Sequence, residues 1–224
     1  MAGTISFYNK AGNRLATIYL GCAPEKGKGR FDGLFRREIE IVKKRFGQAT
    51  YVGIADGAID NWTFLAPLTE TQIQDFFHVA EYIRKFAEAT FRKAAEGKLF
   101  QEKYRTILRD EKDGAQQVLT AMKQGILKIK NTQKTEQARS AVTYMKNHKH
   151  KMDYSVYKEL GYPIGSGVTE AACKTFIKQC LSQSGMKWTN ESVDDVLMAR
   201  ALILSQGRWN QFWNKIDRFG YSAN

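Results

Sequence analysis

The sequence predicts an α/β protein, and three observations along the chain support this class. β-rich runs at 4–8 and 15–20 flank a loop whose Gly and Asn residues tolerate positive φ, which predicts an N-terminal hairpin. Strand-like runs at 50–55 and 72–74 are each followed by a helical pattern, and two successive strand–helix units imply a parallel pair. From about 97 to 154 the pattern is helical and basic, with no strand signal.

The other helices follow from apolar spacing and from helix-breaking residues. An amphipathic helix is predicted over 33–46, because its apolar side chains recur on one helix face: Phe35, Ile39, Val42 and Phe46. Further helices are predicted at 59–65, 77–91, from about 168 onward, 191–206 and 209–218. We expect three segments: a first part of the core over 1–96, a helical insertion over 97–160, and a second part of the core over 161–224.

The composition of the 224 residues is that of a folded protein with a basic surface. Hydrophobic residues make up 43% and charged residues 26%, which argues against disorder. There are 35 Lys and Arg against 23 Asp and Glu, a formal net charge of +12. Such a surface favours a polyanionic partner such as nucleic acid, and a basic solvated surface is the alternative.

The sequence also indicates a cellular compartment. The cysteines Cys22, Cys173 and Cys180 are few and lack metal-ligand spacing, which is typical of reduced thiols rather than of a disulfide framework or zinc site. No apolar run reaches membrane-spanning length, and the N-terminus has no apolar signal segment. We therefore expect a cytoplasmic protein that does not contact a membrane.

Three acidic residues stand out by their positions. Asp56 follows a predicted buried strand, at the carboxyl end where open α/β sheets place their ligands, and Asp75 follows the next strand. Glu170 lies in the first turn of its predicted helix, where the helix dipole favours a carboxylate. Hard oxygen ligands of this kind suit Mg²⁺ or Mn²⁺. The alternative for Glu170 is a residue that only stabilises the start of the helix.

The predicted helix that carries Glu170 has two contrasting faces. At 100° per residue, its apolar side chains share one face: Cys173, Phe176, Ile177 and Cys180. Glu170 lies at the edge of this face, beside Lys174 and Lys178 on the polar side. Lys174, Lys178 and Lys187 are candidates for DNA phosphate contacts, and exposed helix lysines without a ligand are the alternative.

Six short segments, in chain order, resemble the bacterial insertion-sequence transposases of the DDE type, most of all the Kra branch related to mutator-like enzymes. They are Gly3–Tyr8 (GTISFY), Gly53–Ala58 (GIADGA), Asp75–His78 (DFFH), Pro163–Lys174 (PIGSGVTEAACK), Ser184–Trp188 (SGMKW) and Arg208–Trp213 (RWNQFW). Each segment alone is a weak signal. Together they are specific, and the match spans nearly the whole chain.

The resemblance implies a ribonuclease H-like sheet with an all-helical insertion before the final acidic helix. It implies that Asp56 and Glu170 are catalytic metal ligands for Mg²⁺ or Mn²⁺. It also implies that the chain binds the transposon ends and the target DNA. Its protein partner would be a further copy of the same chain, in a homo-oligomer, or an intact transposase. Asp75 and His78 correspond to a C/D-x-x-H motif that organises the active site or the DNA. For His78, packing within its own helix is the alternative.

The order of elements resembles that of the family from its second strand onward. The family's first strand carries the first catalytic Asp, and no acidic residue precedes Glu25 here. We therefore expect a sheet lacking its first strand and an incomplete catalytic set. A rival assignment makes Asp56, Asp75 and Glu170 the full triad, but the interval between the first two is too short for a hairpin and a helix.

Two functions from different classes follow. The first is an insertion-sequence transposase that cleaves and transfers DNA strands with a metal ion, and that is incomplete in this chain. The second is a non-catalytic remnant that binds DNA or an intact transposase. For the C-terminal helix, Trp209 and Trp213 are four residues apart, which predicts core or dimer contacts.

Overall fold

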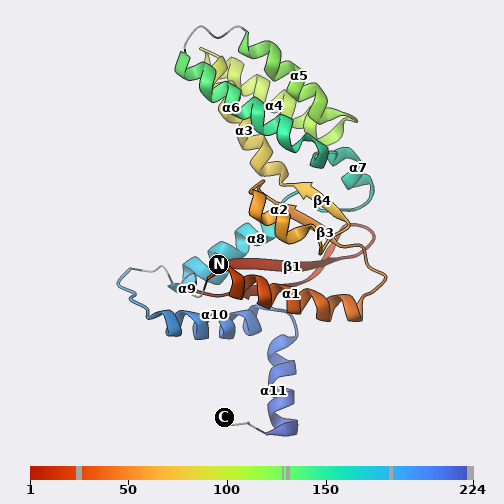
Figure 1. The fold of residues 1–224 in the computed structure, drawn as a ribbon, viewed down its shortest axis with the longest axis vertical. Helices are drawn as coiled ribbons and strands as arrows, with labels where there is room; N and C mark the ends of the chain where they lie inside the picture. Colours follow the sequence, from red (N-terminus) through yellow and green to blue (C-terminus); the bar gives the residue numbers. More distant parts are fainter. Residues whose placement is uncertain (24–26, 128, 130–131, 182–183, 221–224) are drawn as a thin grey trace. The chain divides into compact units, whose positions relative to one another are not determined.

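The computed structural model describes residues 1–23, 27–127, 129, 132–181 and 184–220 (Figure 1). The chain forms two compact units, each with a buried apolar cluster: unit 1 comprises Met1–Ala49 with Gly167–Asn224, and unit 2 comprises Thr50–Ser166. These units divide the chain differently from the predicted segments 1–96, 97–160 and 161–224. The reason is that the strand–helix segments after residue 50 pack with the helices that follow them.

Unit 1 begins with the predicted hairpin. Strand β1 (Ala2–Tyr8) pairs antiparallel with β2 (Arg14–Gly21), and Ile5 lies opposite Ile18. In the turn, the Asn9 side-chain oxygen accepts hydrogen bonds from the backbone N–H groups of Ala11 at 3.0 Å and Asn13 at 2.9 Å. An asparagine that binds its own turn in this way fixes the loop between the strands. The hairpin prediction is therefore confirmed.

Helix α1 (Lys28–Arg45) starts five residues before the predicted position. Phe35, Ile39 and Val42 are buried as their spacing predicted, whereas Phe46 follows the helix and is 43% exposed. The helix lies close to the hairpin, because a Cβ atom added to Gly3 would come within 2.6 Å of the Phe35 ring. Glycine in β1 thus permits the ring of Phe35 to pack against the strand.

The rest of unit 1 is helical: α8 (Gly167–Ala172), the π-helix η3 (Cys173–Lys178), α9 (Gln179–Leu181), α10 (Asn190–Leu204) and α11 (Arg208–Phe219). Its buried cluster contains Ala172, Phe176 and Leu197. The π-helical turns correct the predicted face of this helix, because their wider hydrogen bonding departs from 100° per residue. Of the four predicted core residues, Phe176 is buried, while Cys173, Ile177 and Cys180 are only partly covered.

Helix α11 carries its aromatic side chains on an exposed surface. Trp209 is 41% and Trp213 is 45% exposed, and their rings meet edge to face at 5.5 Å. The expectation that they are core residues is therefore wrong. The expectation of a dimer contact stays a prediction.

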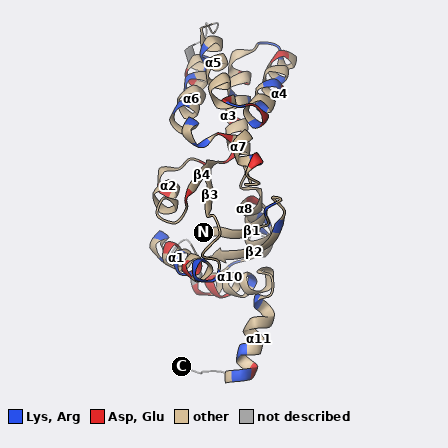
Figure 2. Ribbon diagram, turned by 90° about the vertical axis from the view of Figure 1, so that its right-hand side faces the viewer, with Lys and Arg blue, Asp and Glu red and all other residues tan. Residues whose placement is uncertain are grey.

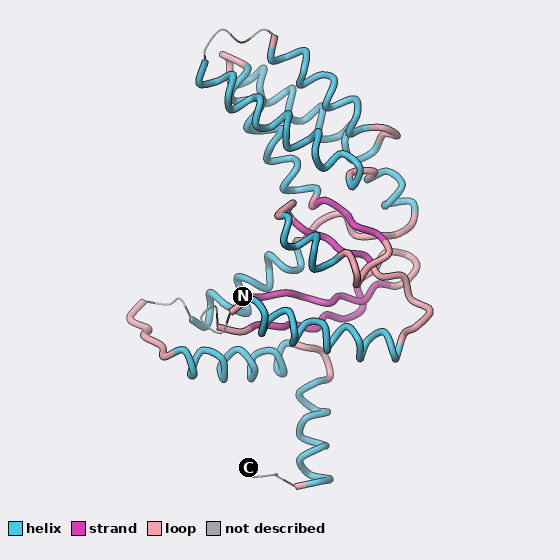
Figure 3. The backbone as a smooth tube through the Cα atoms, viewed as in Figure 1, coloured by secondary structure: helices cyan, strands magenta, loops and turns pink. Residues whose placement is uncertain are grey.

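Unit 2 begins with the predicted parallel pair. Strand β3 (Val52–Ala55) pairs with β4 (Thr71–Gln74) in parallel, with Ile54 opposite Ile73, and α2 (Ile59–Leu65) connects them. Figure 3 shows these strands and the hairpin in magenta. Among the described residues, β1 pairs only with β2 and β3 only with β4. The α/β class is confirmed, with two small sheets and a predominance of helix.

Helices build the larger part of unit 2, as predicted for its basic stretch. They are α3 (Phe76–Thr90), α4 (Ala94–Asp110), α5 (Gly114–Ile126), α6 (Thr132–His148), the short 3-10 helix η2 (Lys149–Lys151) and α7 (Tyr154–Glu159). Helix α3 packs against both α4 and α6. The buried cluster that joins them includes Phe86, Leu108 and Met145. None of the helices in the described ranges is long and apolar enough to cross a membrane.

Candidate functional site

Asp56 lies where β3 ends, and its carboxylate is exposed to solvent. One carboxylate oxygen, Oδ1, accepts hydrogen bonds from the backbone N–H of Ala58 at 3.3 Å and from the side-chain amide of Asn61 at 3.1 Å. Among the described residues, no group donates a hydrogen bond to the other oxygen, Oδ2. The start of α2 therefore orients the carboxylate through one of its two oxygens.

Asp75 follows the neighbouring strand, and its backbone N–H donates to the carbonyl oxygen of Ala55 at 2.9 Å. Asp56 and Asp75 thus leave adjacent strand ends, as the parallel pairing predicted. Their carboxylates differ in environment, because Asp75 is only 1% exposed. Its Oδ1 caps helix α3 by accepting from the N–H groups of Phe77 at 2.7 Å and His78 at 3.0 Å.

The second oxygen of Asp75 holds a distant part of the chain. Its Oδ2 accepts hydrogen bonds from both the backbone N–H, at 2.7 Å, and the hydroxyl of Ser166. With two donors on each oxygen, this buried carboxylate is committed to protein contacts. That arrangement favours an organising role for Asp75 over metal ligation, and it weighs against the rival assignment of Asp56, Asp75 and Glu170 as the triad.

The segment before Ser166 also packs on the start of α3. The carbonyl oxygen of Ile164 accepts from the N–H of Phe76 at 2.9 Å. A Cβ atom added to Gly165 would lie 2.6 Å from the Phe77 ring, so a glycine is required for this close approach. The DFFH segment and the first residues of the Pro163–Lys174 segment (PIGS) are therefore in contact within unit 2.

His78 is partly buried in an aromatic cluster. Its ring meets Tyr82 at 5.5 Å and Tyr144 at 5.8 Å, both edge to face. Tyr82 and Tyr144 stack at 3.7 Å with 9° between their planes, and His148 lies 4.7 Å from Tyr144. His78 therefore packs against Tyr82 of its own helix and against Tyr144, as the alternative role for this residue predicted.

Tyr144 is a residue that the sequence analysis did not single out. Its hydroxyl donates a hydrogen bond to the backbone carbonyl oxygen of Asp56 at 2.8 Å, across 88 residues of chain. Burial raises its pKa, with smaller contributions from Tyr82, Asp56 and Asp75. The hydroxyl therefore remains a proton donor at neutral pH. The i, i+4 spacing of His78 with Tyr82 and of Tyr144 with His148 was the available signal.

Glu170, Lys174, Lys178 and Lys187 belong to unit 1, and all four side chains are exposed. Glu170 is in the first turn of α8, as predicted. The neighbouring Thr169 hydroxyl shares a hydrogen bond with that of Thr4 at 2.8 Å, which fastens α8 to the hairpin. Phe176 packs so closely on β2 that a Cβ atom added to Gly21 would collide with its ring.

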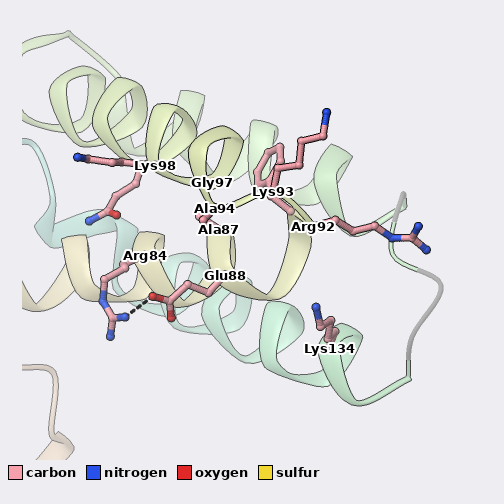
Figure 4. Close-up of a pocket in the computed structure, with 11 residues that line it drawn as sticks. Arg84, Ala87, Glu88, Arg92, Lys93, Ala94, Gly97, Lys98 and Lys134 are labelled. Carbon is pink, nitrogen blue, oxygen red and sulfur yellow. Dashed lines mark hydrogen bonds and ion pairs between the residues drawn. The ribbon is translucent and has the colours of Figure 1, made fainter.

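Asp56, Asp75, His78 and Tyr144 do not line a hollow in the helical part of unit 2. That hollow has a volume of about 360 Å³ and lies beside the start of α4, lined by Arg84, Glu88, Arg92, Lys93, Lys98 and Lys134 among others (Figure 4). Its cations are largely compensated, since Arg84 pairs with Glu81 and Glu88 while Lys93 and Lys98 lie near Glu96 and Glu102. The hollow is therefore a weak candidate for an anion site.

Mg²⁺ and Mn²⁺ are bound by oxygen ligands, which in this chain would come from carboxylates. In the described part of the chain, no group of three or more His, Cys, Asp or Glu side chains is arranged to hold a metal ion. Mg²⁺ bound to substrate phosphates commonly uses one or two carboxylates and several waters. Taken by itself, each of the exposed carboxylates, Asp56 in unit 2 and Glu170 in unit 1, fits such a role, and the fully hydrogen-bonded carboxylate of Asp75 does not.

Comparison of the chain with protein-family models, with curated proteins and with solved structures found no match.

Proposed function

We propose that this protein acts in DNA transposition as a DDE-type transposase polypeptide, cleaving and transferring DNA strands with Mg²⁺ or Mn²⁺. Asp56 and Glu170 are the proposed metal ligands. Asp75 and His78 organise the residues around Asp56. The partners are the transposon ends, the target DNA and a second protein chain, which is either another copy of this chain or an intact transposase.

One observation carries the proposal. The two acidic residues at the ends of the parallel strands have opposite environments. Asp75 is buried, with four donors on its carboxylate, whereas Asp56 is exposed, with a fixed orientation and one oxygen that accepts from no described residue. This is the difference expected between a residue that builds a site and a residue that binds a ligand in it.

The chain's own residues have separate tasks in this proposal. A bound divalent ion would supply Lewis-acid stabilisation of the negative charge that develops during phosphodiester transfer. Asp56 and Glu170 would hold the divalent ion through their carboxylate oxygens. The Ala58 N–H and the Asn61 amide hold the carboxylate of Asp56 in one orientation, so that its Oδ2 is directed outward before the substrate binds.

The proposed fold is ribonuclease H-like. The order of hairpin, helix, parallel strand pair and acidic helix supports this. Among the described residues, each strand pair has edges that are not paired with a further strand.

The test is nicking of supercoiled DNA by the full chain with Mg²⁺, with Mn²⁺ or with EDTA. Asp56→Asn and Glu170→Gln keep the shape of the side chain and remove its charge. We expect both to lower nicking to the EDTA level. The matched controls are Glu159→Gln in unit 2 and Glu40→Gln in unit 1, which are exposed carboxylates away from the motifs. Nicking that persists in both site variants contradicts the proposal.

A second candidate, a non-catalytic DNA-binding protein, is favoured by the charge of unit 1. Lys and Arg exceed Asp and Glu by a wider margin there than in unit 2, and blue segments mark α1 and α11 in Figure 2. Lys174, Lys178 and Lys187 are exposed, and within the described ranges they form no ion pair. Such lysines can contact phosphates without losing an existing partner.

DNA binding measured at increasing salt concentration separates the two candidates. A non-catalytic binder retains its affinity in Asp56→Asn and Glu170→Gln and needs no divalent ion. Replacing the three lysines by alanine should reduce the slope of log affinity against log salt by about 0.9 for each lost phosphate contact. The control is Lys93→Ala with Lys98→Ala, whose ammonium groups lie near carboxylates.

A further inference from the structure

A chain of hydrogen bonds connects three separate elements of unit 2. The buried Gln74 of β4 donates from its side-chain amide to the hydroxyl oxygen of Tyr144 in α6. The Tyr144 hydroxyl in turn donates to the backbone carbonyl oxygen of Asp56 at 2.8 Å. A phenol has one hydrogen to donate, so the bond to Asp56 requires that Gln74 be the donor at the other end.

The ring of Tyr144 is fixed independently of its hydroxyl. It stacks on Tyr82 of α3 at 3.7 Å, and His78 and His148 contact it at 5.8 and 4.7 Å. Tyr82 and Tyr144 come from helices that pack along each other in the core of unit 2. The rigid helices therefore determine where the hydroxyl lies, and loss of the hydroxyl alone would leave the ring packing in place.

The loop after β3 lies directly against this hydroxyl. Gly57 has φ of +103°, and a Cβ atom there would be 3.0 Å from both the Gln74 amide nitrogen and the Tyr144 hydroxyl oxygen. Asp56 is thus held at two points: Tyr144 binds its backbone carbonyl, and the start of α2 binds its carboxylate. Without the hydroxyl, the carbonyl loses its partner and the loop can relax.

We infer that Tyr144 is a positioning residue for Asp56, through which the helical part of unit 2 sets the direction of the carboxylate. Gln74 supports Tyr144 from the buried side. The inference rests on the proposed role of Asp56 as a metal ligand. It assigns to α3 and α6, which supply no proposed metal ligand themselves, a part in building the site.

The decisive variant is Tyr144→Phe, which keeps the stacked ring and removes only the hydroxyl. Substitution of groups that orient a metal ligand typically costs about 10–100-fold in metal affinity or activity, and we expect a loss in that range. The first readout is Mn²⁺ binding to the full chain, measured by titration without DNA. The second is hydrogen exchange at the Ala58 N–H, which donates to the Asp56 carboxylate and should exchange faster in the variant.

The matched control is Tyr104→Phe, because Tyr104 is also half-buried in unit 2 and packs its ring at 4.4 Å on Phe100. All proteins are compared at a temperature at which circular dichroism shows them fully folded, so that a lower melting temperature does not enter the comparison. Tyr104→Phe should leave both readouts unchanged. Wild-type Mn²⁺ affinity in Tyr144→Phe would overturn the inference.

Asp56→Asn separates this inference from the proposed function. If Asp56→Asn weakens Mn²⁺ binding and Tyr144→Phe does not, the positioning role is wrong while the metal site stands. If Asp56→Asn also leaves Mn²⁺ binding unchanged, the proposed function fails at Asp56. Faster exchange at Ala58 in Tyr144→Phe would then still show that the hydroxyl fixes the loop, with no metal site for it to serve.

Discussion

The carboxylate of Asp75 binds the backbone N–H and the hydroxyl of Ser166, a residue 91 positions later in the chain. The same carboxylate caps α3 through Phe77 and His78. One buried side chain therefore fixes both the start of a core helix and the end of unit 2. The DFFH and PIGS segments are far apart in the sequence, and the hydrogen bonds of this one carboxylate join them.

Replacing Asp75 by alanine should destabilise unit 2 by about 2–4 kcal/mol, because it removes a helix cap and leaves buried N–H groups without acceptors. Asp75→Asn should cost less, since its amide oxygen can still cap α3 while its NH₂ group faces the Ser166 donors. The measurement is urea unfolding followed by hydrogen exchange in α3. The control is Asp153→Ala, an exposed residue that precedes α7 without capping it. Equal losses for Asp75→Ala and Asp153→Ala would contradict this role.

The glycine after Asp56 should tolerate no side chain. Gly57→Ala places a Cβ atom in a positive-φ conformation and 3.0 Å from two polar atoms, so we expect a loss of about 1–3 kcal/mol. Gly33→Ala is the matched substitution in helix α1, where a Cβ atom meets nothing within 4 Å. It should stabilise unit 1 by up to about 1 kcal/mol. Thermal unfolding of both variants checks the opposite signs, and a neutral Gly57→Ala would refute the prediction.

Much of the local structure follows from residue patterns near in sequence. The hairpin, the parallel strand pair and α2 were all predicted, because turn residues and apolar spacing act over short distances. The pattern did not reveal the π-helix after Ala172 or the exposure of Trp209 and Trp213, since both depend on packing between distant segments.

The candidate site, too, was predictable only in part from the sequence. The positions of Asp56 and Asp75 at adjacent strand ends were predictable, because parallel strands bring their carboxyl ends together. Which carboxylate is buried was not, because Ser166 arrives from a distant part of the chain. Tyr144 was missed for a similar reason, as 88 residues separate it from Asp56 and its i, i+4 spacing with His148 does not indicate a contact with the end of a strand.

Unit 2 should lose stability as the pH falls below about 6.5, the usual pKa of histidine. Burial lowers the pKa of His148, and Lys151, His150 and His78 lower it further; burial and Lys151 lower that of His150. The unfolded chain therefore takes up protons at a higher pH than the folded one. Stability is complete above the unfolded-state pKa and decreases with falling pH until the folded-state pKa is passed.

His148→Gln tests the pH dependence directly. The residue also packs on Tyr144, which stacks on Tyr82, so the comparison must use the slope of stability against pH rather than its absolute value. We expect a shallower slope between about pH 7.5 and 5.5 in the variant, measured by hydrogen exchange in α3 and α6. The remaining slope belongs in part to His150. An unchanged slope would show that His148 contributes nothing to it.

In unit 1, Arg208 at the start of α11 forms a two-pronged ion pair with the buried Glu38 of α1. Arg208→Ala would leave the Glu38 carboxylate without its partner, while its side chain is only 10% exposed. Because the Arg208 side chain is 31% exposed and water can partly replace it, we expect a loss of about 1–3 kcal/mol rather than the larger cost of a fully buried pair.

A double-mutant cycle with Glu38→Gln and Arg208→Gln isolates the pair from other effects of each substitution. The double variant should be more stable than the sum of the single losses predicts, since it leaves no charge buried without a partner. Arg218→Ala is the control, because Arg218 is exposed on the same helix, with its guanidinium 6.0 Å from the centre of the Phe219 ring. A coupling energy near zero would mean that the Glu38 carboxylate is solvated in the folded protein and that the ion pair does not hold α11 to α1.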